Sequence, residues 1–206
     1  GIALLESVLD AVDRTGSLEL MVYLSALYQE QERYSDAMAI LKRGLSIDPE
    51  NIDLHYELGV LNDKMGRTEA AIEQMKTVIE MSPDNADALN YLGYTYADLG
   101  IKLDEAEALI KKALQLKPDN GYILDSMGWV YYQKQEYEKA LSYLKRAEEE
   151  VSDDPIILEH LGDVYLKLGR AEKALEYYQR SIAAGAEDET RLNDKIRSLR
   201  TQEPPS

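Results

Sequence analysis

The chain contains no cysteine and no phenylalanine, and it has one tryptophan and two histidines among 206 residues. The lack of cysteine excludes disulfide bonds, thiolate nucleophiles and zinc sites built from cysteine. It leaves the redox compartment open, because cysteine-free proteins occur in oxidising and in reducing environments. The aromatic side chains are therefore 15 tyrosines and Trp129.

Basic residues are scarce, and long apolar runs are absent. The chain has 39 acidic and 23 basic residues and a formal net charge of -16. Such a surface repels nucleic-acid backbones and anionic lipids, so we expect no nucleic-acid binding and a preference for basic or neutral partners. No apolar run approaches the roughly 20 residues of a membrane helix, and no signal peptide is recognisable, so we expect no direct membrane insertion by this part of the protein.

Small residues recur along the chain at steps of 34 or 35 residues. One register consists of alanines, and a second consists of an apolar residue followed by a small one. The alanines are Ala37, Ala71, Ala106, Ala140 and Ala174. The pairs are Leu24-Ser25, Leu58-Gly59, Leu92-Gly93, Met127-Gly128 and Leu161-Gly162. A fixed period of this length is typical of a solenoid in which stacked neighbours share one core.

Each period predicts two helices. Apolar residues recur at helical spacing, and "DPEN", "SPDN" and "KPDN" separate one period from the next. The shorter motifs "MGRTEA" and "LGRAEKA" indicate the turn inside a period. One period contains an extra residue, which we expect in the turn "GIKLD", where an insertion is best tolerated.

These registers resemble those of the tetratricopeptide repeat family. The resemblance implies an all-α, right-handed superhelical solenoid of helix-turn-helix hairpins that ends in a capping helix. Five full repeats are expected at residues 18–51, 52–85, 86–120, 121–154 and 155–187, in one continuous solenoid. Residues 1–16 resemble the second helix of a truncated preceding repeat, as though cut from a longer protein. Residues 188–202, with Leu192, Ile196 and Leu199 on one face, predict the capping helix, and residues 203–206 a disordered tail.

Three stretches resemble a narrower group, the C-terminal repeats of bacterial envelope-associated tetratricopeptide lipoproteins. They are "ALNYLGYTYADLGIKLDEAEALIKKAL", "ILDSMGWVYY" and "IILEHLGDVYLKLG". Some members of that group are adaptors for a C-terminal processing protease. The resemblance implies a bacterial adaptor in the periplasm or envelope, and a cytoplasmic assembly scaffold remains the alternative.

In the tetratricopeptide repeat family the first helix of each hairpin lines a concave groove. By its place in the repeat, Trp129 lies on the groove side, opposite the packing stripe of Leu124, Met127 and Tyr131, and we expect it to be partly accessible. The residues that share this side predict a groove that binds a protein segment, basic or apolar, through amphipathic rings and acidic side chains. They are Tyr23, Tyr56, Tyr91, Tyr94, Tyr122, Asp125, Tyr132, Glu159, His160 and Asp163. Two structural alternatives remain, because the tyrosines could pack against neighbouring repeats and the acids could form a solvated face.

The sequence offers no basis for an enzyme. We expect no catalytic residue, cofactor or metal site, and we expect His55 to lie at an ordinary helix interface. A purely structural module that associates with itself is the alternative to a binding scaffold. The first helix would then expose Leu4, Leu5, Val8 or Leu9 unless another chain covers them.

Overall fold

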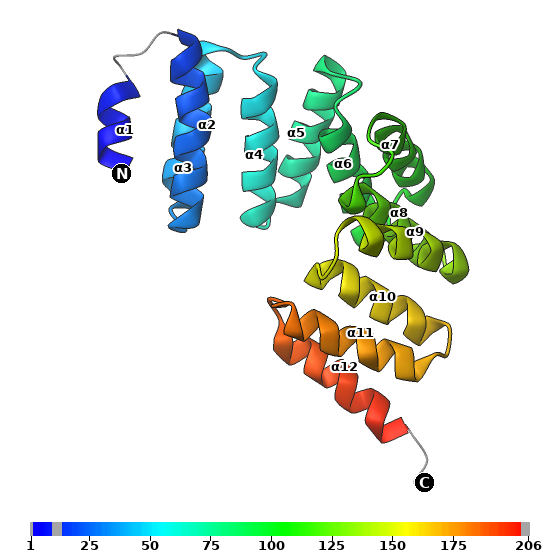
Figure 1. Cartoon of the computed structure of the whole chain (residues 1–206). Coiled ribbons are helices and arrows are strands. Elements are labelled where there is room, and N and C mark those ends of the chain that lie inside the picture. The colour runs from blue at the N-terminus through cyan, green and yellow to red at the C-terminus, as the bar shows by residue number, and fades with distance from the viewer. Residues whose placement is uncertain (1, 10–13, 203–206) are drawn as a thin grey trace. The chain divides into compact units, whose positions relative to one another are not determined.

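The computed structural model describes residues 2–9 and 14–202 (Figure 1). Over these residues the chain forms twelve helices and no strand, which confirms the predicted all-helical class. The chain divides into two compact units, Gly1–Ala88 and Leu89–Ser206. The predicted tail at residues 203–206 lies outside the described residues.

The first unit contains two complete helix pairs. Its helices are α1 (Ile2–Leu9), α2 (Arg14–Glu30), α3 (Tyr34–Ile47), α4 (Ile52–Lys64), α5 (Thr68–Met81) and the start of α6 (Ala86–Asp98). Helix α2 packs against α3, and α4 packs against α5. The sequence predicts that the preceding helix extends to residue 16 and that the first full repeat begins at Leu18. In the structure α2 already begins at Arg14, so residues 14–16 belong to α2 and not to the helix before it. Residues 10–13, also assigned to that earlier helix, lie outside the described residues.

The recurring small residues of the first unit allow paired helices to approach closely. Ala37 and Ala71 are completely buried. A Cβ atom on Gly59 would lie 2.7 Å from the terminal methyl of Met75 on the partner helix. A Cβ on Gly44 would lie 2.6 Å from a methyl of Leu54 at the start of the next pair. The period seen in the sequence therefore reflects a steric requirement at helix crossings.

His55 lies at the packed interface of α4 and α5. Its Nδ1 is 2.7 Å from Gln74 Oε1, and its Nε2 is 2.9 Å from the carbonyl oxygen of Pro49. Both ring nitrogens are thus engaged inside the first unit, as expected for a structural histidine.

The second unit continues the pattern from α6. Its remaining helices are α7 (Leu103–Leu116), α8 (Gly121–Gln133), α9 (Tyr137–Glu150), α10 (Pro155–Lys167), α11 (Ala171–Ala183) and α12 (Glu189–Gln202). The turn between α6 and α7 contains residues 99–102, one residue more than the turns at 134–136 and 168–170. Lys102 in this turn has a φ of 49°, in the left-handed region. The extra residue of the period therefore lies where the sequence predicts it.

Side-chain caps explain where the first helix of each pair begins. In the motifs "DPEN" and "KPDN", the final asparagines Asn51 and Asn120 accept hydrogen bonds from the backbone N–H groups of Leu54 and Ile123, at 3.0 and 3.1 Å. Asp154 caps α10 in the same way. Each cap pairs a backbone donor that the helix itself leaves unsatisfied. Helices α4, α6, α8 and α10 consequently begin at the first residues of four expected repeats, Ile52, Ala86, Gly121 and Pro155.

The last helix covers the final hairpin. Leu192, Ile196 and Leu199 of α12 are buried in one cluster with Ala174 and Tyr178 of α11. Helix α12 thus caps the hairpin of α10 and α11, as the apolar face of the sequence predicts. Its other face looks toward α10 and provides part of the surface described next.

Candidate functional site

One face of α10 carries the residues around which the candidate site of the second unit is built. Ile156, Glu159, Asp163 and Leu166 follow one another at spacings of three or four residues, which places them on the same side of the helix. Ile156 is 57% exposed and Leu166 is 38% exposed, while Glu159 is buried. The face therefore has an exposed apolar side chain at each end and two acidic side chains between them.

A hollow of about 500 Å³ opens at the Ile156 end, and we refer to it as the Trp129 hollow. Tyr94 and Asp98 of α6, Trp129 of α8 and the first two turns of α10 form part of its lining. Residues 185–188 before α12, together with Arg191, complete it. The structure thus brings together five predicted groove residues around this hollow, namely Tyr94, Trp129, Glu159, His160 and Asp163.

Trp129 is half-buried in a stack of rings. Its ring centroid lies 4.6 Å from that of Tyr132, with the two planes 5° apart. The centroid of the His160 ring lies 4.2 Å from that of Trp129, and the planes of these two rings are 18° apart. The indole nitrogen is buried and has no hydrogen-bond partner within the described part of the chain. The ring therefore packs inside the second unit and also borders the hollow.

Asp125 and His160 form a buried pair behind this stack. His160 Nδ1 lies 2.8 Å from Asp125 Oδ1, and both side chains are less than a tenth exposed. Burial alone lowers the pKa of His160, but the carboxylates of Asp125, Asp163 and Glu159 outweigh it and raise the pKa above its usual value of 6.5. The Asp125 carboxylate is therefore used inside the protein rather than offered at the surface.

The raised pKa of His160 makes stability depend on pH. A histidine with a higher pKa in the folded chain stabilises it fully below the unfolded value of about 6.5. This contribution is lost as the pH rises through the folded value. We expect the free energy of unfolding to fall over that window in the wild type, and the fall to be absent in His160→Gln. Urea unfolding at a series of pH values measures it, and equal slopes in the two proteins would exclude His160 as the source.

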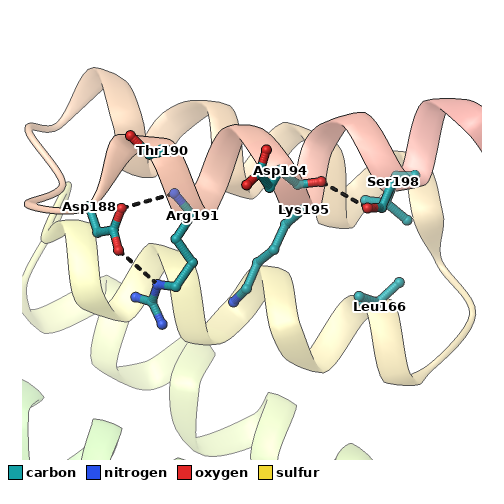
Figure 2. A pocket seen from close by; sticks show the side chains of 8 residues that line it. Leu166, Asp188, Thr190, Arg191, Asp194, Lys195 and Ser198 are labelled. Atoms are coloured by element: carbon teal, nitrogen blue, oxygen red, sulfur yellow. Dashed lines mark hydrogen bonds and ion pairs between the residues drawn. The ribbon is translucent and has the colours of Figure 1, made fainter.

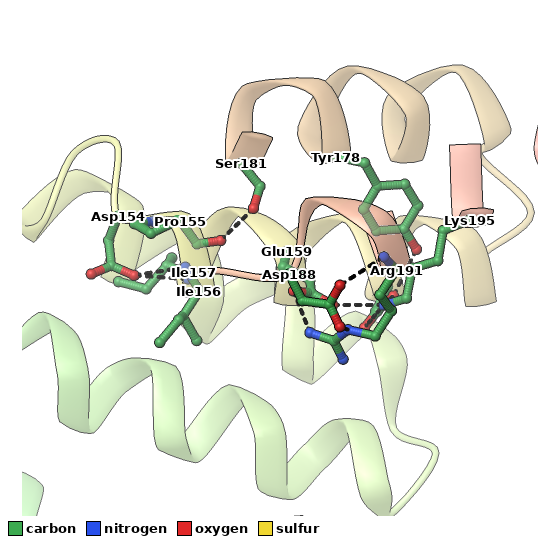
Figure 3. Close-up of polar contacts among 11 residues, drawn as sticks. Asp154, Pro155, Ile156, Ile157, Glu159, Tyr178, Ser181, Asp188, Arg191 and Lys195 are labelled. Carbon is green, nitrogen blue, oxygen red and sulfur yellow. Dashed lines mark hydrogen bonds and ion pairs between the residues drawn. The ribbon is translucent and has the colours of Figure 1, made fainter. Parts of the chain in front are cut away.

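Two cations from α12 bind the central acids of the α10 face. Arg191 Nη2 lies 2.8 Å from Glu159 Oε2, and Lys195 Nζ lies 2.8 Å from Glu159 Oε1 (Figure 3). Lys195 also contacts Asp163 at 2.6 Å, and the Tyr178 hydroxyl donates to the same carboxylate at 2.6 Å. These cations were not predicted from the sequence, because the capping helix is predicted from its apolar face alone. The spacing of Arg191 and Lys195, four residues apart on the other face, was the available signal.

A second hollow of about 600 Å³ lies at the Leu166 end, and we refer to it as the Leu166 hollow. Leu166 borders it on α10, and Arg191 and Lys195 of α12 point toward α10 (Figure 2). The rest of the lining comes from Asp188, Thr190, Asp194, Ser198 and Leu199. Asp188 and Arg191 line both hollows. The two hollows therefore share residues and are neighbours along the α10 face.

The remaining predicted tyrosines are placed differently. In the second unit Tyr122 is 57% exposed and does not line either hollow, while Tyr91 is half-buried. The pKa of Tyr132 is raised to about 12, mainly because the ring is buried and also because Asp163 and Tyr137 lie nearby. The pKa of Tyr94 is also raised, mainly by burial and next by the carboxylate of Asp98. In the first unit Tyr23 is exposed and Tyr56 is half-buried.

The described residues contain no cluster of three or more histidine, aspartate or glutamate side chains able to hold a metal ion. Over the same ranges, none of the helices combines the length and the apolar character needed to cross a membrane.

Solved structures with the same fold include a thermophilic TPR protein of Thermus thermophilus, with a TM-score of 0.74 and 24% identity, covering 89% of this chain and 99% of that one. The pilus biogenesis factor PilW matches with a TM-score of 0.78 and 20% identity, covering 89% and 86% of the two chains. At these identities the likeness concerns the fold alone.

Among curated proteins, a TPR repeat-containing protein of Pseudomonas aeruginosa is 31% identical over 127 residues. The aligned part is 62% of this chain, and it spans only 22% of the relative's length. Three models described as tetratricopeptide repeat match residues 24–90, 64–125 and 126–189, which together reach from the first full helix pair to the start of α12. The chain belongs to the tetratricopeptide repeat family.

Proposed function

We propose that the chain is a protein-binding scaffold that holds a segment of a partner protein in the Trp129 hollow. The observation that carries this proposal is the exposure of Ile156, 57%, beside the rings of Tyr94 and Trp129 in a hollow of about 500 Å³. An exposed apolar side chain next to amphipathic rings is the composition that protein interfaces favour. The repeats themselves support an interaction scaffold in general.

The charge around the hollow favours a basic segment. Asp98 and Glu187 border it, and neither forms an ion pair within the described ranges. Glu159 and Asp163 are already neutralised by α12, so they add little further attraction. A partner with arginine or lysine beside an apolar residue would complement this arrangement.

The wider setting is also part of the proposal. The sequence stretches that resemble envelope lipoproteins favour an adaptor in the bacterial envelope, with a cytoplasmic scaffold as the alternative. We propose the tyrosines outside the hollow, Tyr23, Tyr56, Tyr91 and Tyr122, as further contacts for the partner. Tyr23 and Tyr122 are the most accessible of them.

Self-association is a second candidate function, supported by one observation. On α1, Leu4 is 69% exposed and Val8 is 38% exposed, whereas Leu9 is buried in one cluster with residues of α2, α3 and α4. An apolar edge of this kind could pack on a second copy. Light scattering over a range of protein concentrations separates this function from a binding scaffold that stays monomeric.

A peptide selection tests the main proposal. Peptides enriched on the immobilised protein from a random display library are titrated while the emission of Trp129, the only tryptophan, is recorded. We expect Ile156→Ser to weaken binding about tenfold, because a buried apolar contact is lost. Leu116→Ser is the matched control, since Leu116 is also exposed but lies on α7 outside both hollows. The proposal fails if selection yields no peptide that changes the emission, or if both variants weaken binding equally.

A further inference from the structure

The two hollows on the α10 face differ in the side chains that remain available to a ligand. Two carboxylates at the Trp129 hollow, those of Asp98 and Glu187, form no ion pair with the described part of the chain. They lie at a hollow with the rings of Tyr94 and Trp129. Tyr132 and His160 already stack on Trp129, so a guanidinium or ammonium group would stack on the Tyr94 ring and lie beside Trp129, while a carboxylate balances its charge. This hollow therefore suits a basic side chain.

At the Leu166 hollow the charged groups are already engaged. Lys195 binds Glu159 and Asp163, and Arg197 Nη1 lies 3.0 Å from Asp194 Oδ1. The Ser198 hydroxyl donates to the carbonyl oxygen of Asp194 at 2.9 Å. What this hollow leaves open is the apolar side chain of Leu166, which is 38% exposed. It therefore suits an apolar side chain.

The distance between the hollows follows from the geometry of α10. Ile156 and Leu166 are ten residues apart on one helix face, so about 15 Å separates them at 1.5 Å per residue. An extended chain advances about 3.3 Å per residue and covers this distance in about five residues. Between the two ends lie Glu159 and Asp163, which Arg191 and Lys195 neutralise, so the middle of the path demands no particular charge.

We propose that the α10 face, from the Trp129 hollow to the Leu166 hollow, recognises one extended protein segment with two anchors about five residues apart. A basic residue lies in the Trp129 hollow, with Asp98 and Glu187 as its counter-charges. An apolar residue lies against Leu166. This inference rests on the proposed binding function and adds to it the chemistry and the spacing of the recognised segment.

Peptides enriched by selection on the whole chain provide the probes. We expect them to share a basic and an apolar residue at a fixed spacing of about five. For one such peptide, changing the basic residue to glutamine and changing the apolar residue to serine should each weaken binding several-fold. Deleting two residues between the anchors should weaken it about as much as losing one anchor.

Protein variants assign each anchor to its hollow. Asp98→Asn should weaken binding about three- to fivefold, as for an exposed ion pair, with Asp119→Asn as the control for loss of one charge elsewhere. Leu166→Ser should weaken it about five- to tenfold, with Leu116→Ser as its control. The effect of Asp98→Asn should vanish with the glutamine peptide, and that of Leu166→Ser with the serine peptide.

The outcomes separate this inference from the function on which it rests. Peptides that bind and change the Trp129 emission, but lack a basic anchor or tolerate any spacing, overturn the two-anchor segment and leave the binding scaffold intact. The same holds if Asp98→Asn and Leu166→Ser act no more strongly than their controls. If no peptide binds at all, both the function and the inference are overturned.

Discussion

Replacing Ala71 by glutamate is expected to lower the free energy of unfolding by about 3–5 kcal/mol, the usual cost of an uncompensated buried charge. Ala71 is completely buried in α5, and its carbonyl oxygen would lie 3.6 Å from a Cβ on Gly59 of α4. The helices are thus in contact where the new side chain would have to fit. Urea unfolding followed by circular dichroism at 222 nm, a standard helix signal, measures the loss.

Ala70→Glu provides the matched control for this prediction. Ala70 is the preceding residue of the same helix and is exposed. The Ala70→Glu variant places the same negative charge in the first turn of α5, where an acidic side chain leaves helix stability unchanged or raises it slightly. We expect its stability to stay within about 0.5 kcal/mol of the wild type. Equal losses in both variants would mean that Ala71 does not lie at a tight helix contact.

Replacing Trp129 by alanine is expected to lower the free energy of unfolding by about 2–3 kcal/mol. The variant loses stacked contacts with Tyr132 and His160, at centroid distances of 4.6 and 4.2 Å, and leaves a cavity between them. Fully buried aromatic residues cost roughly 3–5 kcal/mol on truncation, and Trp129 is only half-buried, so the loss should be smaller. Thermal unfolding followed by circular dichroism measures this loss of stability, because the variant has no tryptophan fluorescence to follow.

Tyr122→Ala is the control for the ring stack. Tyr122 belongs to the same helix and is 57% exposed, so its loss should change stability by no more than about 0.5 kcal/mol. A Trp129→Ala variant that unfolds like the wild type would show that the stack contributes nothing to stability. A stability loss of this size would obscure an effect of Trp129→Ala on binding, whereas Ile156 and Asp98 lie at the surface of the Trp129 hollow.

The fold could be predicted from the sequence because its determinants are local or periodic. Ala37 and Ala71 recur where helices cross, and Asn51 and Asn120 cap the helices that follow them. Even the extra residue between α6 and α7 follows from the change of period from 34 to 35. Each of these features depends on near neighbours in the sequence or on the repeat itself.

The site could be predicted only in part, since its contacts join different repeats and the capping helix. The resemblance to the tetratricopeptide repeat family predicts that Trp129 lies on the groove side, but it does not reveal the stacking of His160, which is 31 residues further along. It likewise places Asp125 on that side without revealing the buried pair that it forms with His160. The sequence does not indicate that Glu159 and Asp163 are paired, because α12 follows no repeat register that would align Arg191 and Lys195 with them.

The turn between α6 and α7 has a practical consequence for engineering. It contains one residue more than its counterparts, and both Leu99 and Ile101 are exposed, 49% and 44%. The helices on either side, α6 and α7, keep the lengths of 13 and 14 residues that other pairs have. Added length in a surface turn costs little, because the entropy of closing a loop grows only slowly with its size. An epitope tag or a surface anchor introduced between Gly100 and Ile101 would therefore give a handle for immobilisation outside both hollows.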